Sequence, residues 1–197
     1  MGKDIDIIKV ITHADGGEAY SEHATNYTSN VDSVAVKGYG VDETDTKNAQ
    51  MQFDTTARYY GNEGKNEYIQ LMMAFLKDTA DDAETAMAIT DQVIDPLKAN
   101  HLILIGEHKK QTVKSDYHTH TFIETTDLET GKMLHPNNKF NYSMAQRMAD
   151  TIQKPVKLVI EKKNKSPEPD SSQNGGNNTK KKKDFTRRFY PHKNTND

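Results

Sequence analysis

The sequence predicts an α+β fold, in which helices pack on a mainly antiparallel five-stranded sheet. Short apolar segments of strand length alternate with longer segments of helical periodicity, and two strand segments follow each other closely around residues 101–125. No internal repeat is visible. A length of 197 residues allows one domain of about 150 residues and a tail.

Each strand segment is short and rich in Ile, Val, Leu, Met or Phe. Such runs of four to nine or so residues are typical of strands that are buried on at least one face. We expect five strands, at residues 4–12, 67–75, 101–107, 118–125 and 156–161.

The clearest helix covers residues 81–99. It opens with acidic residues, which favour a helix N-terminus, and it spaces Ala86, Ile89, Val93 and Leu97 at helical intervals. A second helix is expected at residues 142–153 and a weaker third one at residues 19–28.

Charge divides the chain into a domain, residues 1–162, and a polar basic tail, residues 163–197. From Glu161 onward there are ten Lys and Arg against five Asp and Glu, whereas residues 1–160 have 16 against 24. The tail is rich in Pro, Ser, Gly and Asn, so we expect it to be disordered. Its cations are suited to DNA phosphates, although such runs also serve as solubilising or targeting tails; they are Lys180, Lys181, Lys182, Lys183, Arg187 and Arg188.

Composition excludes several classes of protein. The chain has no cysteine, which rules out disulfide frameworks, cysteine zinc sites and thiol nucleophiles. It lacks the 18 or so consecutive apolar residues of a membrane helix, and its first residues do not resemble a secretory signal. We therefore expect a cytoplasmic protein without a membrane partner.

Three histidines have spacing that suits a metal site. His118 and His120 are two apart on an expected strand, so their side chains point to the same face. A hairpin would bring His108, at the end of the preceding strand, beside them. Three imidazoles leave coordination positions open for a substrate oxygen, as in catalytic sites. The alternative is that the pair lies on the surface beside Thr119 and Thr121.

The stretch HLILIGEHKKQTVKSDYHTHTFIETTDLETGKMLHPNNKF resembles the histidine motif of plasmid mobilisation relaxases, in the HUH endonuclease superfamily. A strand ends in a histidine, the His-x-His strand returns, and a turn of the form D..TGK.LH follows. ATNYTSN, residues 24–30, is similar to the short motif that carries the family's nucleophilic tyrosine, and GYGVDETDTKNAQMQFDTTARYYG and EYIQLMMAF follow in the family's order. The resemblance covers about residues 5–160 and implies the relaxase fold.

Four positions depart from the family pattern. Thr119 stands where an apolar residue is usual, and Ile69 where a histidine often follows the strand's tyrosine. Asp116 replaces a further histidine found in some relaxases, and Glu124 an asparagine. A carboxylate at position 116 would suit a metal ligand or a group that orients an imidazole.

The resemblance implies an enzyme that nicks one DNA strand at a plasmid transfer origin by tyrosine transesterification. Tyr27 would attack the phosphodiester and form a 5′-phosphotyrosyl intermediate, and a divalent ion, Mn or Mg, held by His108, His118 and His120 would neutralise the phosphate. The partners implied are single-stranded or supercoiled plasmid DNA at the transfer origin, with accessory mobilisation and coupling proteins.

Further residues are candidates for support. His13 and His23 are placed to accept the tyrosine's proton or to contact DNA, and Asp116 and Glu124 to support the histidines. Arg58, Lys65 and Lys132 are candidate phosphate contacts. Other tyrosines compete with Tyr27 for the nucleophile's role, namely Tyr20, Tyr39, Tyr59 and Tyr60.

Three alternatives remain at this point. A rolling-circle replication initiator uses the same chemistry, but it usually carries its tyrosine after the histidines. A noncatalytic DNA-binding protein with a degenerate relaxase fold would fit the altered positions 116, 119 and 124. A metal-binding hydrolase of small molecules would turn over without a covalent DNA adduct.

Overall fold

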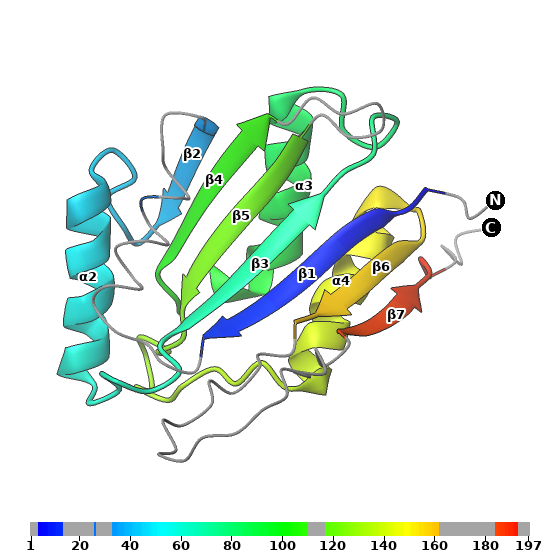
Figure 1. The fold of residues 1–197 in the computed structure, drawn as a ribbon. Coiled ribbons are helices and arrows are strands. Elements are labelled where there is room, and N and C mark those ends of the chain that lie inside the picture. The colour runs from blue at the N-terminus through cyan, green and yellow to red at the C-terminus, as the bar shows by residue number, and fades with distance from the viewer. Residues whose placement is uncertain (1–3, 14–25, 27–32, 110–116, 162–183, 193–197) are drawn as a thin grey trace, which may run out of the picture.

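A computed structural model describes residues 4–13, 26, 33–109, 117–161 and 184–192. The described strands form one seven-stranded sheet in the order β2-β4-β5-β3-β1-β6-β7 (Figure 1). The strands are β1 (Asp6–His13), β2 (Ser33–Tyr39), β3 (Tyr68–Ala74), β4 (Ile103–Lys109), β5 (Tyr117–Glu124), β6 (Val156–Ile160) and β7 (Phe185–Phe189). The helices are α2 (Thr46–Tyr59), α3 (Ala83–Ile94) and α4 (Asn138–Ile152), with a 3-10 turn, η1 (Asp95–Leu97), after α3.

The pairing is mainly antiparallel, as the sequence predicted, but the sheet is larger and mixed. β1 pairs antiparallel with β3 and parallel with β6, while the other neighbouring strands all run antiparallel. The five expected strands are present as β1, β3, β4, β5 and β6. The prediction of five strands is wrong because it omitted the two edge strands, β2 and β7.

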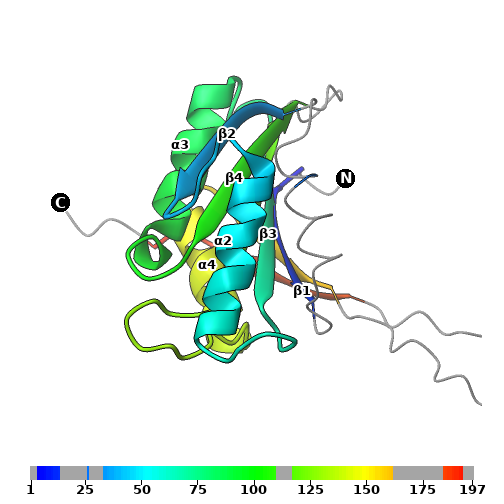
Figure 2. The same cartoon turned by 90° about the vertical axis from the view of Figure 1, so that its left-hand side faces the viewer.

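The main core lies between the sheet and the helices α3 and α4, which cover the same face (Figure 2). Alternate residues of β1 show which way the strand faces: Ile8 and Val10 are fully buried in this core, and Ile7 and Lys9 on the other face are only half-buried. Because side chains alternate along a strand, each cross-strand row can be assigned to one face from the register.

The helix α2 packs on the face of the sheet opposite α3 and α4. Its buried residues Ala49, Phe53 and Ala57 are four apart and form one stripe, and Phe53 contacts the rings of Tyr68 and Phe122 edge-on. The N-terminus is capped by Asp45, whose carboxylate accepts hydrogen bonds from two backbone amides. Few large apolar residues mark this helix, which explains why the sequence prediction missed it.

The expectation of a disordered tail is wrong for β7. Phe185–Phe189 pairs with β6, and Phe189 is almost fully buried. The ring of Tyr142 on α4 contacts Phe185 and Phe189, and the guanidinium of Arg187 lies 4.7 Å from its centroid. Composition suggested disorder, but two aromatic residues four apart lie on the same face of the strand and pack against a third ring from the helix.

The remaining helices differ from the prediction mainly at their ends. The helix expected at residues 81–99 ends as α-helix at Ile94 and continues as η1, where Pro96 lacks the amide hydrogen that a regular helix needs. The helix expected from residue 142 begins at Asn138, because Asn137 caps it. The expected helix at residues 19–28 falls outside the described residues except for Asn26. Among the described residues, no helix is both long and apolar enough to cross a membrane.

Candidate active site

The three predicted histidines lie together on the face of the sheet that α3 and α4 leave uncovered. His108 is the cross-strand partner of His118, and His120 lies opposite Gly106. Gly106 has no side chain, so the ring of His120 has room beside His108. The ring centroids are 5.5 Å apart for His108 and His118, and 5.2 Å for each of the other two pairs.

This spacing fits rings that share one ion. Three imidazoles that each bind a metal through a nitrogen at about 2.1 Å would place their centroids about 5 Å apart. Within the part of the chain that the structure describes, however, no group of three or more ligand side chains is arranged as a coordinating set. The cluster thus has the spacing of a metal site but not the arrangement of a complete coordinating set.

Burial keeps His120 uncharged near neutral pH. It lowers the pKa of His120 to about 3, and the neighbouring imidazoles of His118 and His108 contribute to the lowering. A neutral imidazole retains the lone pair that a metal requires. Gln70, on β3, lies 2.9 Å from His120 Nδ1 and fixes the orientation of this ring.

Gln70 is a site residue that the sequence prediction missed. A lone glutamine in an apolar strand is a weak signal. Only the pairing of β3 with β5 shows that Gln70 and His120 belong to the same face.

Two altered motif positions lie away from the cluster. Thr119, between the paired histidines, points to the opposite face, where its hydroxyl lies 2.8 Å from that of Thr90 on α3. Glu124 is fully buried beyond Phe122, and its carboxylate accepts hydrogen bonds from the amide and hydroxyl of Thr126. The structure therefore gives Glu124 a partner in the following turn and not among the histidines.

Several candidates cannot be placed. Tyr20, His23, Tyr27 and Asp116 lie outside the described residues, as do Lys180, Lys181, Lys182 and Lys183. His13 is the last residue of β1, where its backbone pairs with Tyr68, at the end of the strand away from the histidine row.

The described competing tyrosines are not at the cluster. Tyr39 bonds Asp91 on the α3 side of the sheet. Tyr60 donates a hydrogen bond to the carbonyl of Leu128, 2.6 Å away, and Tyr59 lies exposed beside it on α2.

Three predicted phosphate contacts lie around α2 and the turn after β5. Arg58 forms an exposed ion pair with Glu63, and Lys65 donates to the side chain of Asn62. Lys132 is exposed in a tight turn. None of the three lies on the strands that carry the histidines.

The turn that includes Lys132 is rigid. Asp127 accepts hydrogen bonds from the amides of Glu129 and Thr130, and its backbone bonds to Gly131 and Lys132. Gly131 has a φ of 69° and packs against the ring of Tyr60. The D..TGK segment thus acts as a folded connector between β5 and α4.

Arg187 and Arg188 are adjacent on β7 and so face opposite sides of the sheet. Arg187 lies over Tyr142 on the α4 side. Arg188 is the cross-strand neighbour of Lys157, on the side of the histidines. The contact of either arginine with DNA stays a prediction.

Comparison with known proteins shows the family of the chain. The model of the family described as "Relaxase: MobA/VirD2-like, nuclease domain" matches residues 20–158. No curated protein matches the chain. The matched segment spans most of the chain and includes the histidine strands, α2, α3 and α4. The chain therefore belongs to the relaxase family, with a MobA/VirD2-like nuclease domain.

Proposed function

We propose that this relaxase nicks one strand at a plasmid transfer origin and holds the cut end as a 5′-phosphotyrosyl ester. The observation that carries the proposal is the cluster of three imidazoles on adjacent strands, within a domain of the relaxase family. The position of Tyr27 in the motif ATNYTSN supports its assignment as the nucleophile.

His108, His118 and His120 are the residues that would hold a divalent ion, Mn or Mg. When bound, such an ion would neutralise the non-bridging oxygens of the scissile phosphate and polarise its phosphorus. The amide of Gln70 keeps the ring of His120 in place, so that less reorganisation is needed when a ligand arrives.

The bond changes balance without a further reactant. The phenolic oxygen of Tyr27 forms a bond to phosphorus, and the bond from phosphorus to the 3′ oxygen breaks. The phenol gives up its proton, for which His13 and His23 are the candidate acceptors, and the leaving 3′ oxygen takes up a proton. Because the ester conserves one phosphodiester-like bond, the reaction can run backwards and rejoin the strand.

The test uses labelled single-stranded oligonucleotides tiled across the DNA that flanks the gene, with Mn²⁺ or Mg²⁺. We expect one tile to give a covalent protein–DNA adduct on a denaturing gel. Tyr27→Phe should abolish the adduct, and His120→Ala should slow its formation about 100-fold, because the ion would lose a ligand.

His135→Ala is the control, since His135 is exposed in the turn after β5. A wild-type chain that gives no adduct with any tile would contradict the enzyme and favour the noncatalytic DNA-binding alternative. An adduct that persists in Tyr27→Phe would show that another tyrosine is the nucleophile. Full activity of His120→Ala would contradict the role of the histidines.

A further inference from the structure

A straight row of residues crosses the sheet from the histidines to its far edge. The printed registers place His108, His118, Ala74, Ile7, Lys157 and Arg188 side by side on β4, β5, β3, β1, β6 and β7. Strand alternation puts all six on the face opposite α3 and α4. The row therefore begins at two imidazoles and ends at two cations.

The two cations are available for a ligand. Lys157 is half-buried and Arg188 is exposed, and among the described residues neither takes part in an ion pair. The nearest cation on the same face, Lys9, differs in this respect because it pairs with Glu161 at 3.0 Å. Within the row, Ile7 and Ala74 lie between the cations and the histidines, and their side chains are apolar.

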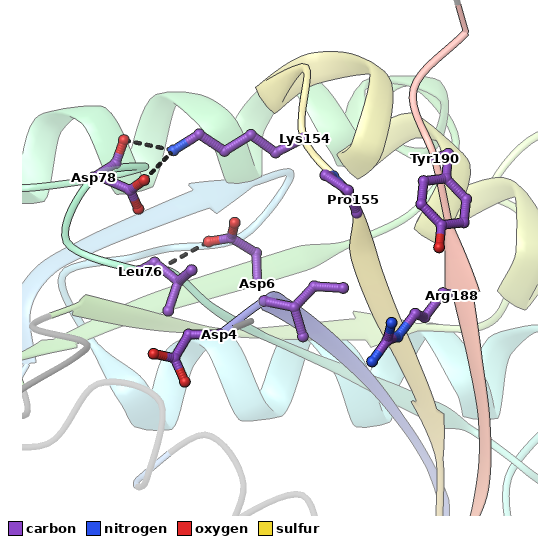
Figure 3. Close-up of a pocket in the computed structure, with 9 residues that line it drawn as sticks. Asp4, Asp6, Leu76, Asp78, Lys154, Pro155, Arg188 and Tyr190 are labelled. Atoms are coloured by element: carbon purple, nitrogen blue, oxygen red, sulfur yellow. Dashed lines mark hydrogen bonds and ion pairs between the residues drawn. The ribbon is translucent and has the colours of Figure 1, made fainter. Parts of the chain in front are cut away.

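Carboxylates near Arg188 have partners of their own. Arg188 lies at the rim of a cavity of about 400 Å³, opposite Asp6, Asp78 and Lys154 (Figure 3). Asp6 accepts hydrogen bonds from the amide of Leu76 and the hydroxyl of Thr79, and Asp78 pairs with Lys154 at 3.0 Å. The acids in the cavity disfavour a phosphate inside it. An anion bound by Arg188 would therefore lie outside the cavity, over the sheet.

The distances fit a single strand of DNA. Neighbouring strands are about 4.8 Å apart, so Lys157 lies about 14 Å and Arg188 about 19 Å from the row position of His118. Successive phosphates of one strand are about 3.4 Å apart when measured along the axis of a duplex, and up to about twice that distance apart when the strand is extended. Lys157 and Arg188 would then meet the second and third phosphates from the one at the histidines.

We propose that Lys157 and Arg188 bind backbone phosphates of the DNA strand and lead it across β3 and β1 to the histidines. This inference rests on the proposed function for the identity of the ligand. It also gives β7 a role: the strand brings Arg188 onto the histidine face, while Arg187 anchors the same strand to α4. We call Lys157 and Arg188 the cation pair.

The first test measures binding without metal, so that it does not depend on cleavage. The probe is a fluorescent 12-nucleotide oligothymidylate, titrated by anisotropy at several salt concentrations. Lys157→Gln and Arg188→Gln should each weaken binding about three- to tenfold and reduce the slope of log K against log salt by about 0.7, the loss of one phosphate contact. Arg188→Lys should restore most of the loss.

A matched variant separates a specific site from a general effect of charge. Lys139→Gln removes an exposed cation at the start of α4. It should not change the salt slope. Equal weakening by Lys139→Gln and Arg188→Gln, with both variants folded by circular dichroism, would overturn the proposal, as would a wild-type chain that does not bind the oligonucleotide.

The absence of cysteine permits a second, direct test of the face. Arg188→Cys, Lys157→Cys, Arg187→Cys and Lys139→Cys each introduce a single thiol, whose rate of alkylation can be followed with and without the oligonucleotide. DNA should slow alkylation at positions 188 and 157 and leave positions 187 and 139 unchanged; protection of all four would overturn the proposal. A failed nicking assay with intact protection at 157 and 188 would contradict the proposed function alone.

Discussion

At the scale of single residues, the alternation of side chains along β5 decides which motif positions belong to the site. His118 and His120 lie on the face of the sheet opposite α3 and α4, and Thr119 faces α3. The family expectation of an apolar residue at position 119 is therefore a requirement of the core. Thr119 meets it by sharing a hydrogen bond with Thr90, which compensates for burying the hydroxyl.

Glu124 is buried for structural reasons, and this makes stability depend on pH. Burial raises the pKa of its carboxyl to about 7, although hydrogen bonds from Thr126 oppose the shift. Because the folded chain holds this proton at a pH where the unfolded chain has lost it, the contribution of Glu124 to stability is greatest below about pH 4.5 and falls as the pH rises toward 7. The decrease due to Glu124 should be roughly 1–3 kcal/mol.

Glu124→Gln should remove this part of the pH dependence. Urea denaturation at pH 5, 6, 7 and 8 would measure it as the difference in unfolding free energy between variant and wild type. Glu129→Gln serves as the control, since Glu129 is exposed in the turn that follows. Parallel pH profiles for wild type and Glu124→Gln would contradict the expectation, and adduct formation should persist in Glu124→Gln.

At the scale of elements, the sequence predicted those strands and helices in which apolar residues recur regularly on one face. The five strands of the interior and the helices near residues 81–99 and 142–153 have such patterns. α2 buries one large apolar side chain, Phe53, and β2 contains Gly38, which weakens a strand signal. Those elements are stabilised by partners distant in sequence, such as Tyr68 and Phe122, which local patterns do not reveal.

The turn after β5 depends on one glycine. A Cβ at Gly131 would lie 2.6 Å from Cδ1 of Tyr60, and the φ of 69° is unfavourable for other residues. Gly131→Ala should therefore cost about 2–4 kcal/mol of unfolding free energy, as the sum of backbone strain and a clash with the ring.

Gly61→Ala is a matched control for this prediction. Gly61 has the same φ of 69°, but a Cβ there would have no atom within 4 Å. It should cost only the backbone term, about 1 kcal/mol. Denaturation curves that give equal losses for the two variants would show that the ring of Tyr60 moves aside without cost.

At the scale of the whole molecule, the sequence predicted the histidine cluster but not the direction in which the sheet extends from it. The His-x-His spacing and one preceding histidine were sufficient for the cluster, because all three lie on one hairpin. The row to Lys157 and Arg188 depends on the parallel pairing of β1 with β6 and on β7. Neither pairing has a local signal.

Removal of the tail should affect both stability and association. A chain that ends at Glu161 loses β7, and with it the burial of Phe189 against α4 and the contacts of His192 and Tyr190 with Asp150 and Gln146. We expect an unfolding free energy lower by about 2–4 kcal/mol. The free edge of β6 should also promote self-association, because unpaired strand edges template further pairing.

Denaturation and size-exclusion chromatography would measure these effects. Phe189→Ala in the full chain is the comparison, since it removes the buried ring and keeps the backbone of β7. A truncated chain that is as stable as the full one, and elutes as the same species, would show that β7 contributes little to the fold.

The strands β4 and β5, which carry the three histidines of the cluster, are consecutive in the chain. The strands β1 and β6, in contrast, pair residues that are 150 positions apart in the sequence. Closing a short loop costs less entropy than closing a long one. During folding, the hairpin can therefore assemble well before the far edge of the sheet is complete. A nascent or refolding chain would therefore bring the three imidazoles together first and align Lys157 and Arg188 with them last.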